Sequence, residues 1–400
     1  MTYIGIELKT PTGGHRMRNA PTILGQVLSN LQLWHKFSSI VKKIGADRYV
    51  KEFRTVDVLK WLIVSVIVGV KSLRELGEYL RYNRGMLAVA GVKCAGLSTL
   101  SHAMSNRDAD ALEKFFYYLV EQFRCVPMKL KKNIELASYI MDGTNITVFG
   151  QGSEWAKAKR HRHEVRVVLL TQMGGVPVGA EISGASVAEI TSAQKLDMSN
   201  VQLLVMDRGY KKYGFWQRLT DDGKFFITRA MDNMVYEVAG ARRGRRPAGI
   251  LDDDYIRVYK NRHTRTFYPM KLRLIEYKTS DGKILRFVTN NLELVADDIA
   301  ELYRKRWEIE TFFRFLKQTF NASRLIARSP NAVRAQIFAM LILVLLLHIL
   351  KQQMRFDGNL FQLFRKISCV PLKTIPMQML ITHNDRTTYE SSVPFCNSLF

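Results

Sequence analysis

The chain has 400 residues, of which 60 are Lys or Arg and 36 are Asp or Glu, so its formal net charge is +24. A single hydrophobic core rarely supports a chain of this length, and two or three domains are expected. The positive charge attracts polyanions, with nucleic acid the first expected partner. Proteins of ribosomes and membrane surfaces usually carry such charge in tails, whereas here Lys and Arg are spread along a sequence that is 47% hydrophobic.

The cysteines and apolar runs exclude several other classes of protein. The four cysteines are widely spaced, at Cys94, Cys125, Cys369 and Cys396. This spacing predicts neither a disulfide framework nor a structural zinc site. Residues 61–70 and 337–350 are apolar but shorter than the roughly 18 to 20 residues that cross a bilayer, so both are expected to be buried core helices. The first residues lack the apolar stretch of a secretory signal, and a reduced cytoplasmic setting is expected.

The N-terminal third is expected to be helical. Residues 1–30 show no clear periodicity and predict a flexible arm, whereas residues 31–132 have helical spacing of apolar residues and predict an all-α domain for DNA binding or dimerisation. Ser72 is expected to cap one helix, and another is expected to begin near Ser105. Two short helices joined by a tight turn suit a helix-turn-helix reader of DNA, but most such pairs are structural, and both interpretations stay open.

After residue 132 the pattern becomes strand-like. Two β-type runs flank Gly174 and Gly175, which is typical of a hairpin. A helix is predicted over residues 186–198, and the apolar run VQLLVMD after it predicts a buried strand. Residues 133–221 are therefore expected to form the first part of an α/β core.

The remaining sequence is first β-rich and then helical. FFITRA, YIRVYKN, MKLRLIEYK and KILRFVTNN are strand-like and predict a β-rich insertion over residues 222–292. Residues 293–352 are expected to add core helices, and residues 353–400 are assigned to a C-terminal tail. The predicted fold class is α/β, with an all-α domain first and a β-rich insertion within the core.

Two aspartates follow short apolar runs. Asp142 comes after SYIM and Asp207 after LLVM, so each is expected where a buried strand reaches the carboxyl edge of the sheet. Ligands of α/β proteins bind at that edge. Taken singly, either aspartate is more simply interpreted as a turn residue, because Asp142-Gly143 and Asp207-Arg208-Gly209 both suit turns.

A third acid, Glu310, lies in a sequence that predicts an amphipathic helix. At 100° per residue, one polar stripe about 60° wide contains Tyr303, Arg306, Glu310 and Lys317. The adjacent face is apolar and consists of Ile309, Phe312, Phe313 and Leu316. Such a helix can rest on the core while its polar stripe faces a ligand. The alternative is a solvated face with ordinary i,i+4 pairing of Arg306 with Glu310.

The polar stripe matches the Y-x2-R-x3-E-x6-K signature of the IS4-family transposases. The chain resembles this family also in MDGTNI around Asp142, VMDRGY around Asp207 and VTNN at residues 288–291. SLRELGEYL and STLSHAMSNRD resemble the helical domain that precedes the core in one branch of the family. The resemblance covers residues 35–350 and implies an RNase H-like core in which Asp142, Asp207 and Glu310 are the catalytic, metal-binding acids of a DDE transposase.

The chemistry of these acids agrees with the resemblance. Three carboxylates are hard oxygen ligands suited to Mg²⁺, or to Mn²⁺ in its place. Two such ions stabilise the attacking and leaving oxygens of an in-line phosphoryl transfer. The resemblance implies cleavage of double-stranded DNA at insertion-sequence ends and strand transfer into target DNA, without a covalent protein nucleophile. It also implies a homodimer in the DNA complex, no membrane association, and a location at the nucleoid of a prokaryotic cytoplasm.

The same resemblance implies which residues hold the DNA. Tyr303, Arg306 and Lys317 would position the transposon end through its phosphates. Trp307 could stack on an unpaired base, or it could be a buried aromatic that anchors the helix.

Three charged segments are harder to assign. The basic segments 155–163 and 241–247 are expected in loops, where their charge either meets phosphate or is solvated. The acidic run at residues 252–254 is expected to be a solvated turn rather than a metal site.

Other functions stay open at the level of the sequence. A nuclease of the same fold that cuts without rejoining would need the same acids, although the polar stripe argues against it. A catalytically inactive DNA-binding protein descended from a transposase is a second alternative, and the presence of all three acids argues against it. A purely structural role for the acids requires that they fail to converge in the folded protein.

Overall fold

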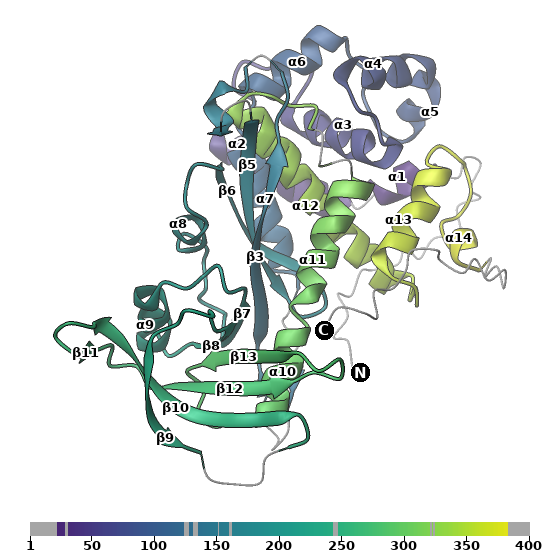
Figure 1. Ribbon diagram of the computed structural model, residues 1–400. Helices are drawn as coiled ribbons and strands as arrows, with labels where there is room; N and C mark the ends of the chain where they lie inside the picture. Colours follow the sequence, from purple (N-terminus) through teal and green to yellow (C-terminus); the bar gives the residue numbers. More distant parts are fainter. Residues whose placement is uncertain are drawn as a thin grey trace. The chain divides into compact units, whose positions relative to one another are not determined.

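The computed structural model of the protein describes a chain that divides into two compact units (Figure 1). The described residues are 22–28, 31–123, 128–130, 135–150, 152–159, 162–242, 247–320, 322 and 325–382. The first unit takes the described residues of Met1–Arg124, Ile146–Val165 and Phe313–Thr388. The second takes those of Cys125–Asn145 and Arg166–Phe312. The six segments assigned from the sequence, and the five boundaries between them, stay predictions.

The first unit is mainly helical. Its helices are α1 (Ile23–Val27), α2 (Leu31–Ile44), α3 (Thr55–Val68), α4 (Leu73–Tyr82), α5 (Arg84–Val89), α6 (Leu97–Asn106), α7 (Asp110–Val120), α12 (Pro330–Gln353), α13 (Leu360–Cys369) and α14 (Met379–Thr382). The Ser72 side chain accepts a hydrogen bond from Glu75 N at 3.1 Å, so the predicted cap of α4 is confirmed. Helix α6 ends at Asn106 and α7 begins at Asp110, so the helix start predicted near Ser105 is wrong.

Helix α12 lies at the centre of this unit. It has 24 residues, and by length and composition alone it could cross a membrane, so the argument that its apolar run is too short is wrong. However, 83% of its most apolar 18-residue stretch is buried inside the protein. It packs against α3, α6, α7 and α13, as the expected core helix should.

Two segments assigned to an arm and a tail contain ordered helices. Thr22 caps α1, and the backbone N–H groups of Ile23 and Leu24 donate to the carbonyls of Lys373 and Pro371 at 3.0 and 2.7 Å. Helix α13 buries Leu363, Phe364 and Ile367. Residues 23–27 of the segment expected to be an arm are thus helical, because this short apolar stretch pairs with the segment after α13, a partner that local periodicity cannot reveal.

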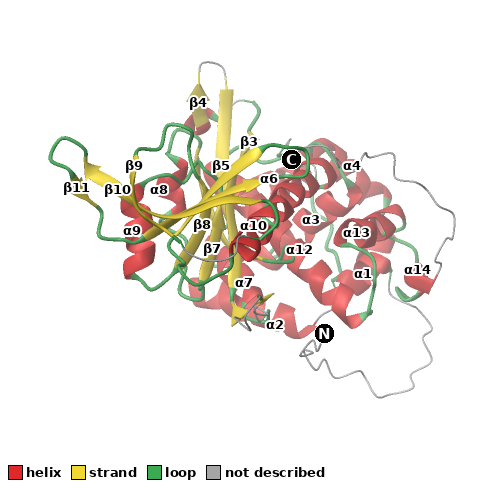
Figure 2. Cartoon of the chain, turned by 60° about the horizontal axis from the view of Figure 1, so that its bottom comes forward, coloured by secondary structure: helices red, strands yellow, loops and turns green. Residues whose placement is uncertain are grey.

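The second unit is built on a large twisted sheet (Figure 2). Its longer strands are β3 (Ser138–Thr147), β5 (Arg162–Gln172), β6 (Pro177–Gly184), β7 (Leu203–Met206), β8 (Phe225–Arg229), β9 (Tyr236–Ala241), β10 (Ile250–Asn261), β12 (Leu272–Lys278) and β13 (Ile284–Thr289). The short strand β11 (Thr266–Phe267) belongs to the same sheet, whereas β1 (Met128–Lys129) and β2 (Glu135–Leu136) pair as a separate two-stranded sheet. A further short strand, β4 (Lys157–Lys159), lies within the residues assigned to the first unit.

Five neighbouring strands form the expected RNase H-like core. Strands β8, β7, β3 and β5 follow one another across the sheet, and β6 pairs with β5. β7 runs parallel to both β3 and β8. The hairpin predicted at Gly174 and Gly175 joins β5 to β6, and both glycines have positive φ angles, of 101° and 83°. The sequence-based fold class is confirmed.

The predicted β-rich insertion does not form a sheet of its own. Strand β8, which the sequence assigned to the insertion, completes the core by pairing with β7, and β13 pairs antiparallel with β8. β12, β10 and β11 continue the same sheet outward, and β9 pairs with β10. Main-chain hydrogen bonds at the edge of β8 thus join the inserted strands to the core.

Helices cover both faces of this sheet. The side chains of β7 alternate: Leu204 and Met206 pack with the helices α8 (Glu189–Ala193) and α9 (Tyr213–Asp221), whereas Leu203 and Val205 pack with α10 (Ala296–Arg304). All four are fully buried, as expected for a strand with both faces covered. Helix α8 is shorter than the predicted helix over residues 186–198.

The charged segments also differ from expectation. Lys157–Lys159 forms β4, which pairs with β5, so this part of the basic segment is strand rather than loop. Residues 243–246 of the second basic segment lie outside the described residues. Asp253 is in β10, 8% exposed, and bonds the fully buried Arg273 guanidinium at 3.0 and 2.7 Å. The expected solvated turn is therefore wrong, because a bidentate pair holds this acid in the core.

Candidate active site

The two aspartates lie side by side on adjacent parallel strands. Met141 of β3 pairs with Met206 of β7, so Asp142 and Asp207 are the next residues along the two strands. β7 ends at Met206, but β3 continues to Thr147. The interpretation of Asp142-Gly143 as a turn is therefore wrong, whereas Asp207 stands at the carboxyl end of its strand as expected.

Arg306 joins the first aspartate to the third acid. Its Nη1 atom lies 3.4 Å from Asp142 Oδ2, and its Nη2 atom lies 2.6 Å from Glu310 Oε1. The Arg306 side chain is 9% exposed, and no described acceptor bonds its buried Nε atom. The i,i+4 pair of the alternative interpretation is thus present, but it is buried and shared with Asp142 rather than set on a solvated face. Asp142 and Glu310 converge on one guanidinium although they lie 168 positions apart in the sequence.

Tyr303 connects Asp207 to the same group. Its hydroxyl donates to Asp207 Oδ1 at 3.4 Å, and the Arg306 guanidinium carbon lies 5.5 Å from the centre of its ring. Tyr303 is 5% exposed, and burial raises its pKa to about 12. The hydroxyl therefore stays protonated at neutral pH and can donate to the aspartate.

Asp142 carries the most perturbed carboxylate of the site. Its pKa is raised to about 7, first by burial and then by the negative charges of Asp207 and Glu189. The Gly143 N–H, at 2.8 Å from Asp142 Oδ1, and the Arg306 guanidinium act in the opposite direction. Near neutral pH this carboxylate exchanges its proton readily, and a nearby positive charge would favour the ionised form.

The polar stripe does not lie on a single α-helix. Helix α10 ends at Arg304, α11 spans Trp307–Arg314, and Phe315–Thr319 form a π-helical turn. Between α10 and α11, the Arg306 N–H donates to the Tyr303 carbonyl at 3.0 Å, three residues back. Because such turns advance by about 120° per residue rather than 100°, the stripe calculated for a regular helix is wrong.

The four stripe residues belong to two different units. Tyr303, Arg306 and Glu310 belong to the second unit and lie together at the acids. Lys317 belongs to the first unit, in the π-helical turn, where burial lowers its pKa and the charge of Glu164 acts in the opposite direction. The four apolar residues of the adjacent face are buried, as the sequence predicted.

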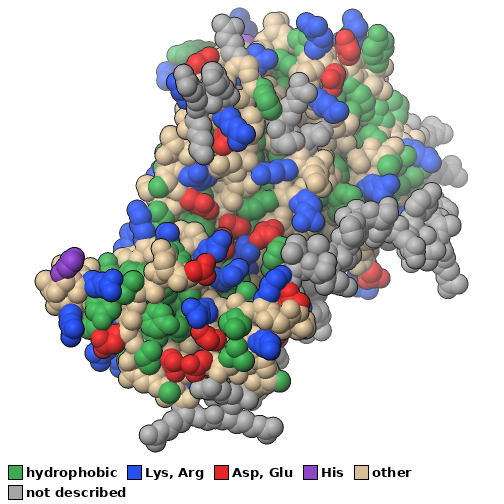
Figure 3. Space-filling model, in the orientation of Figure 1, with side chains coloured by type: hydrophobic (Ala, Val, Ile, Leu, Met, Phe, Trp, Pro, Cys, Tyr) green, Lys and Arg blue, Asp and Glu red, His purple; other side chains and the backbone are tan. Residues whose placement is uncertain are grey.

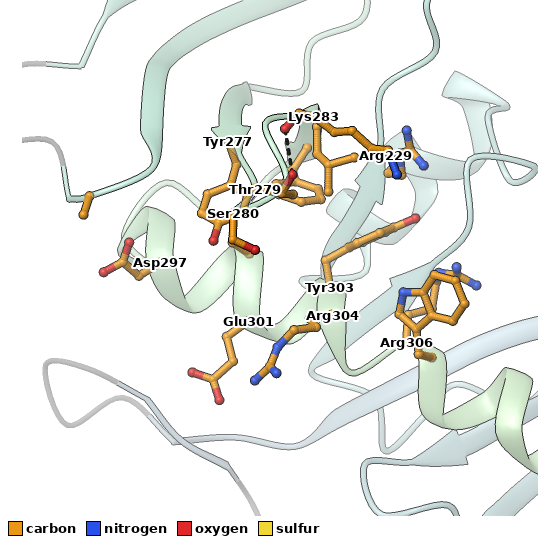
Figure 4. A pocket seen from close by; sticks show the side chains of 15 residues that line it. Arg229, Tyr277, Thr279, Ser280, Lys283, Asp297, Glu301, Tyr303, Arg304 and Arg306 are labelled. Atoms are coloured by element: carbon orange, nitrogen blue, oxygen red, sulfur yellow. Dashed lines mark hydrogen bonds between the residues drawn. The ribbon is translucent and has the colours of Figure 1, made fainter. Parts of the chain in front are cut away.

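A cavity of about 720 Å³ opens next to Tyr303 and Arg306. Its lining carries four basic side chains, Arg229, Lys283, Arg304 and Arg306, together with Trp307. Figure 4 shows Arg229, Tyr303 and Arg306 at one end of the cavity, away from Asp297 and Glu301. Trp307 is 43% exposed, so it is not the buried anchor of the alternative interpretation.

Two further residues of this region were missed from the sequence. Glu189 begins α8, and its Oε1 atom accepts a hydrogen bond from the Tyr210 hydroxyl at 2.5 Å. Tyr210 is 1% exposed and stands three residues after Asp207. The VMDRGY motif contains this tyrosine, but no sequence signal distinguishes Glu189 from an ordinary acid at a helix start.

The residues present fit a divalent cation by their chemistry. In their present orientations, no three His, Cys, Asp or Glu side chains among the described residues are grouped closely enough to hold an ion. The carboxylates are nevertheless hard oxygen donors. Asp142 and Asp207 lie on neighbouring strands, and their mutual repulsion is relieved only where positive charge is supplied. Arg306 supplies part of that charge.

Comparisons with known proteins point in one direction. Residues 138–346 match the family described as Transposase DDE domain, and residues 19–93 match a domain of unknown function (DUF4372). The chain is 29% identical over 215 residues to a protein described as transposase y4zB in Sinorhizobium fredii, covering 52% of this chain and 60% of that protein.

Two other relatives are named for insertion sequences. A protein of Geobacillus stearothermophilus, described as a transposase for element IS5377, is 27% identical and matched over 55% of this chain and 58% of its own length. A protein of Synechocystis, described as a transposase for element IS4SA, is 26% identical, with coverage of 78% and 88%. The chain thus spans about 60% of the length of the first two relatives.

Among solved structures, a piggyBac transposase synaptic complex with hairpin DNA matches 93% of this chain and 84% of its own, at 10% identity and a TM-score of 0.46.

Proposed function

The chain belongs to the transposase family defined by the DDE domain, which matches more than half of it, and we propose that it cuts DNA at insertion-sequence ends and joins them to target DNA. The reaction is a metal-dependent, in-line phosphoryl transfer. Asp142, Asp207 and Glu310 are the proposed catalytic acids.

One observation carries the proposal. The Arg306 guanidinium bonds both Asp142 and Glu310, and Tyr303, which contacts Arg306, bonds Asp207. A purely structural role for three separate acids gives no reason for them to meet around one buried arginine. A phosphoryl-transfer site requires clustered carboxylates and a nearby positive charge.

The roles of the residues follow from their chemistry. Asp142, Asp207 and Glu310 would hold two Mg²⁺ ions, or Mn²⁺ in their place, through carboxylate oxygens. When bound, the ions supply charge stabilisation for the attacking and leaving oxygens. Asp142 must lose its proton to serve as a ligand, and the neighbouring Arg306 favours that loss. Tyr303 keeps its proton and orients Asp207.

The same proposal assigns the DNA contacts. Arg306, with Tyr303, and the basic cavity beside them suit a phosphate of the transposon end. Trp307 is exposed enough to stack on an unpaired base. Lys317 is proposed as a further phosphate contact. Joining two DNA ends calls for two active sites, so we expect a homodimer in the DNA complex, acting on double-stranded DNA at the nucleoid of the cytoplasm.

The test is cleavage of labelled duplex DNA that carries the ends of the element encoding this chain. We expect Mg²⁺- or Mn²⁺-dependent nicking at the element boundary by the intact protein, and at least a hundredfold slower nicking by Glu310→Gln with DNA binding retained. Glu308→Gln is the matched control. Glu308, on the same helix, accepts a hydrogen bond from Gly174 N at 2.8 Å, which glutamine can also accept, so this variant should cleave normally.

Other outcomes would redirect the assignment. Binding without cleavage by any of the proteins would indicate a DNA-binding protein derived from a transposase. Cleavage without joining of the ends to target DNA would indicate a nuclease.

A further inference from the structure

A fourth carboxylate, that of Glu189, lies beside the proposed acids. A Cβ atom built on Gly143 would lie 2.3 Å from Glu189 Oε1 and 2.8 Å from its Cδ atom, so the carboxylate lies directly against the backbone at residue 143. Asp142 Oδ1 accepts a hydrogen bond from the Gly143 N–H at 2.8 Å, so the carboxylates of Asp142 and Glu189 both lie at the backbone of Gly143. Only a residue without a side chain leaves room for this approach.

Tyr210 fixes the carboxylate in this position. Its hydroxyl donates to Glu189 Oε1 at 2.5 Å, and its backbone N–H donates to the Asp207 carbonyl at 3.1 Å. The Trp216 indole N–H donates to the Tyr210 carbonyl at 2.8 Å, which holds the tyrosine from the other side. Glu189 is thereby tied to the segments that follow both Asp142 and Asp207.

Glu189 has no ion-pair partner among the Lys, Arg and His side chains of the described residues. It is half-buried. Arg306, the buried cation of the site, bonds Asp142 and Glu310, and its buried Nε atom has no described acceptor. A half-buried carboxylate beside another acid is unfavourable unless a cation compensates. A tyrosine hydroxyl holds it in place but supplies no charge.

We propose that Glu189 is a fourth carboxylate of the divalent-cation site, next to Asp142, and that Tyr210 is its positioning residue. The inference rests on the proposed function, since it concerns the same ions. Glu189 and Tyr210 would then set the affinity for the cation, while the assigned roles of Asp142, Asp207 and Glu310 stay unchanged.

The direct test is Mn²⁺ binding to the full-length protein without DNA, measured by calorimetry and by the Mn²⁺ paramagnetic resonance signal. Glu189→Gln keeps an acceptor for the Tyr210 hydroxyl but removes the charge. We expect Mn²⁺ affinity to fall by about tenfold or more. The Mg²⁺ concentration for half-maximal cleavage should rise in parallel, and Tyr210→Phe should cause a smaller loss of the same kind.

Two more variants keep the test decisive. Gly143→Ala places a methyl group where the Glu189 carboxylate now lies and displaces it without changing any charge, so Mn²⁺ affinity should again fall. Glu181→Gln is the matched control. Glu181 lies in β6 and pairs with Lys195 at 2.9 Å, so its loss should leave Mn²⁺ binding unchanged.

The outcomes separate the two proposals. If the intact protein binds Mn²⁺ and cleaves DNA, and folded Glu189→Gln binds Mn²⁺ equally well, Glu189 is not part of the cation site. If Glu189→Gln fails to fold, wild-type Mn²⁺ affinity in Gly143→Ala overturns the inference. If the intact protein neither binds Mn²⁺ nor cleaves DNA, the proposed function fails, and the inference fails with it.

Discussion

The surroundings of Asp142 in the folded protein favour the protonated, neutral form of its carboxyl group. Burial and the charges of Asp207 and Glu189 raise its pKa to about 7, despite the Gly143 N–H and Arg306. Between about pH 4 and 7 the folded protein therefore binds a proton that the unfolded chain has lost, and its stability falls as pH rises through this window. Above about pH 7 the loss of stability caused by the ionised Asp142 carboxylate no longer changes with pH.

We therefore expect Asp142→Asn to stabilise the protein in EDTA. Asparagine resembles the protonated aspartate in shape but carries no charge. At pH 8 the free energy of unfolding should rise by roughly 2 kcal/mol, whereas at pH 4 it should be nearly unchanged. Urea unfolding at the two pH values measures both. A variant that is less stable than wild type at pH 8 would mean that Arg306 already compensates the ionised carboxylate in full.

The same raised pKa couples metal binding to pH. A carboxylate must be deprotonated to bind a cation, so an ion bound at Asp142, as proposed, would displace a proton near neutral pH. If Asp142→Asn loses activity but is more stable than the wild type in EDTA, the aspartate at this position is required for activity and lowers the stability of the fold.

At the scale of elements, the strands of the sheet could be predicted from the sequence, but the break between α10 and α11 within the polar stripe could not. The four residues of β7 form one apolar run because both faces of the strand are covered, and such a run is visible in the sequence. The break between α10 and α11 is not visible, since Lys305 and Arg306 are good helix formers. Arg306 has its partner Asp142 164 positions away, and only the folded chain brings them together.

The position of Asp253 also depends on a partner that the local sequence does not show. A run of three aspartates is typical of a turn, yet Asp253 lies in a strand because Arg273 of the neighbouring β12 pairs with it. The three proposed catalytic acids stand out in the sequence because strand ends and motif spacing are local features. Glu189 was missed because its importance depends on contacts with Gly143 and Tyr210 alone.

The segment VTNN illustrates how an element is joined to its neighbours. Asn290, after β13, accepts a hydrogen bond from Phe226 N of β8 at 2.8 Å and donates to the Lys224 carbonyl at 2.8 Å and to Thr220 of α9 at 3.0 Å. It is 8% exposed. Within the VTNN motif, Asn290 therefore joins the inserted strands to the core of the sheet by hydrogen bonds.

Asn290→Ala should consequently destabilise the protein by about 3 kcal/mol, because it leaves buried backbone groups without partners. The midpoint of urea unfolding measures the change. Asn261→Ala is the matched control: that amide also bonds two backbone N–H groups, of His263 and Thr264, but in an exposed turn. The control should lose less than about 1 kcal/mol. Equal losses in the two variants would show that Asn290 does not join the strands.

At the scale of the whole molecule, 60 Lys and Arg residues outnumber 36 Asp and Glu residues. On the face drawn in Figure 3, Lys and Arg side chains are scattered among Asp and Glu over the surface. The net charge of +24 therefore acts as a broad field that attracts DNA of any sequence. The proposed selection of the element's ends would come from a smaller number of contacts within that field.

This distribution predicts steeply salt-dependent binding to DNA. If six to ten phosphates are neutralised, affinity for a linear duplex should fall by about 10³-fold or more between 50 and 200 mM salt, because released counterions drive the association. Fluorescence anisotropy in EDTA measures it without cleavage. Glu310→Gln should show the same dependence of DNA affinity on salt concentration, because it changes one acid of the site and no Lys or Arg residue. Salt-independent binding would mean that the excess charge does not face the DNA, and the basic surface would then need another partner.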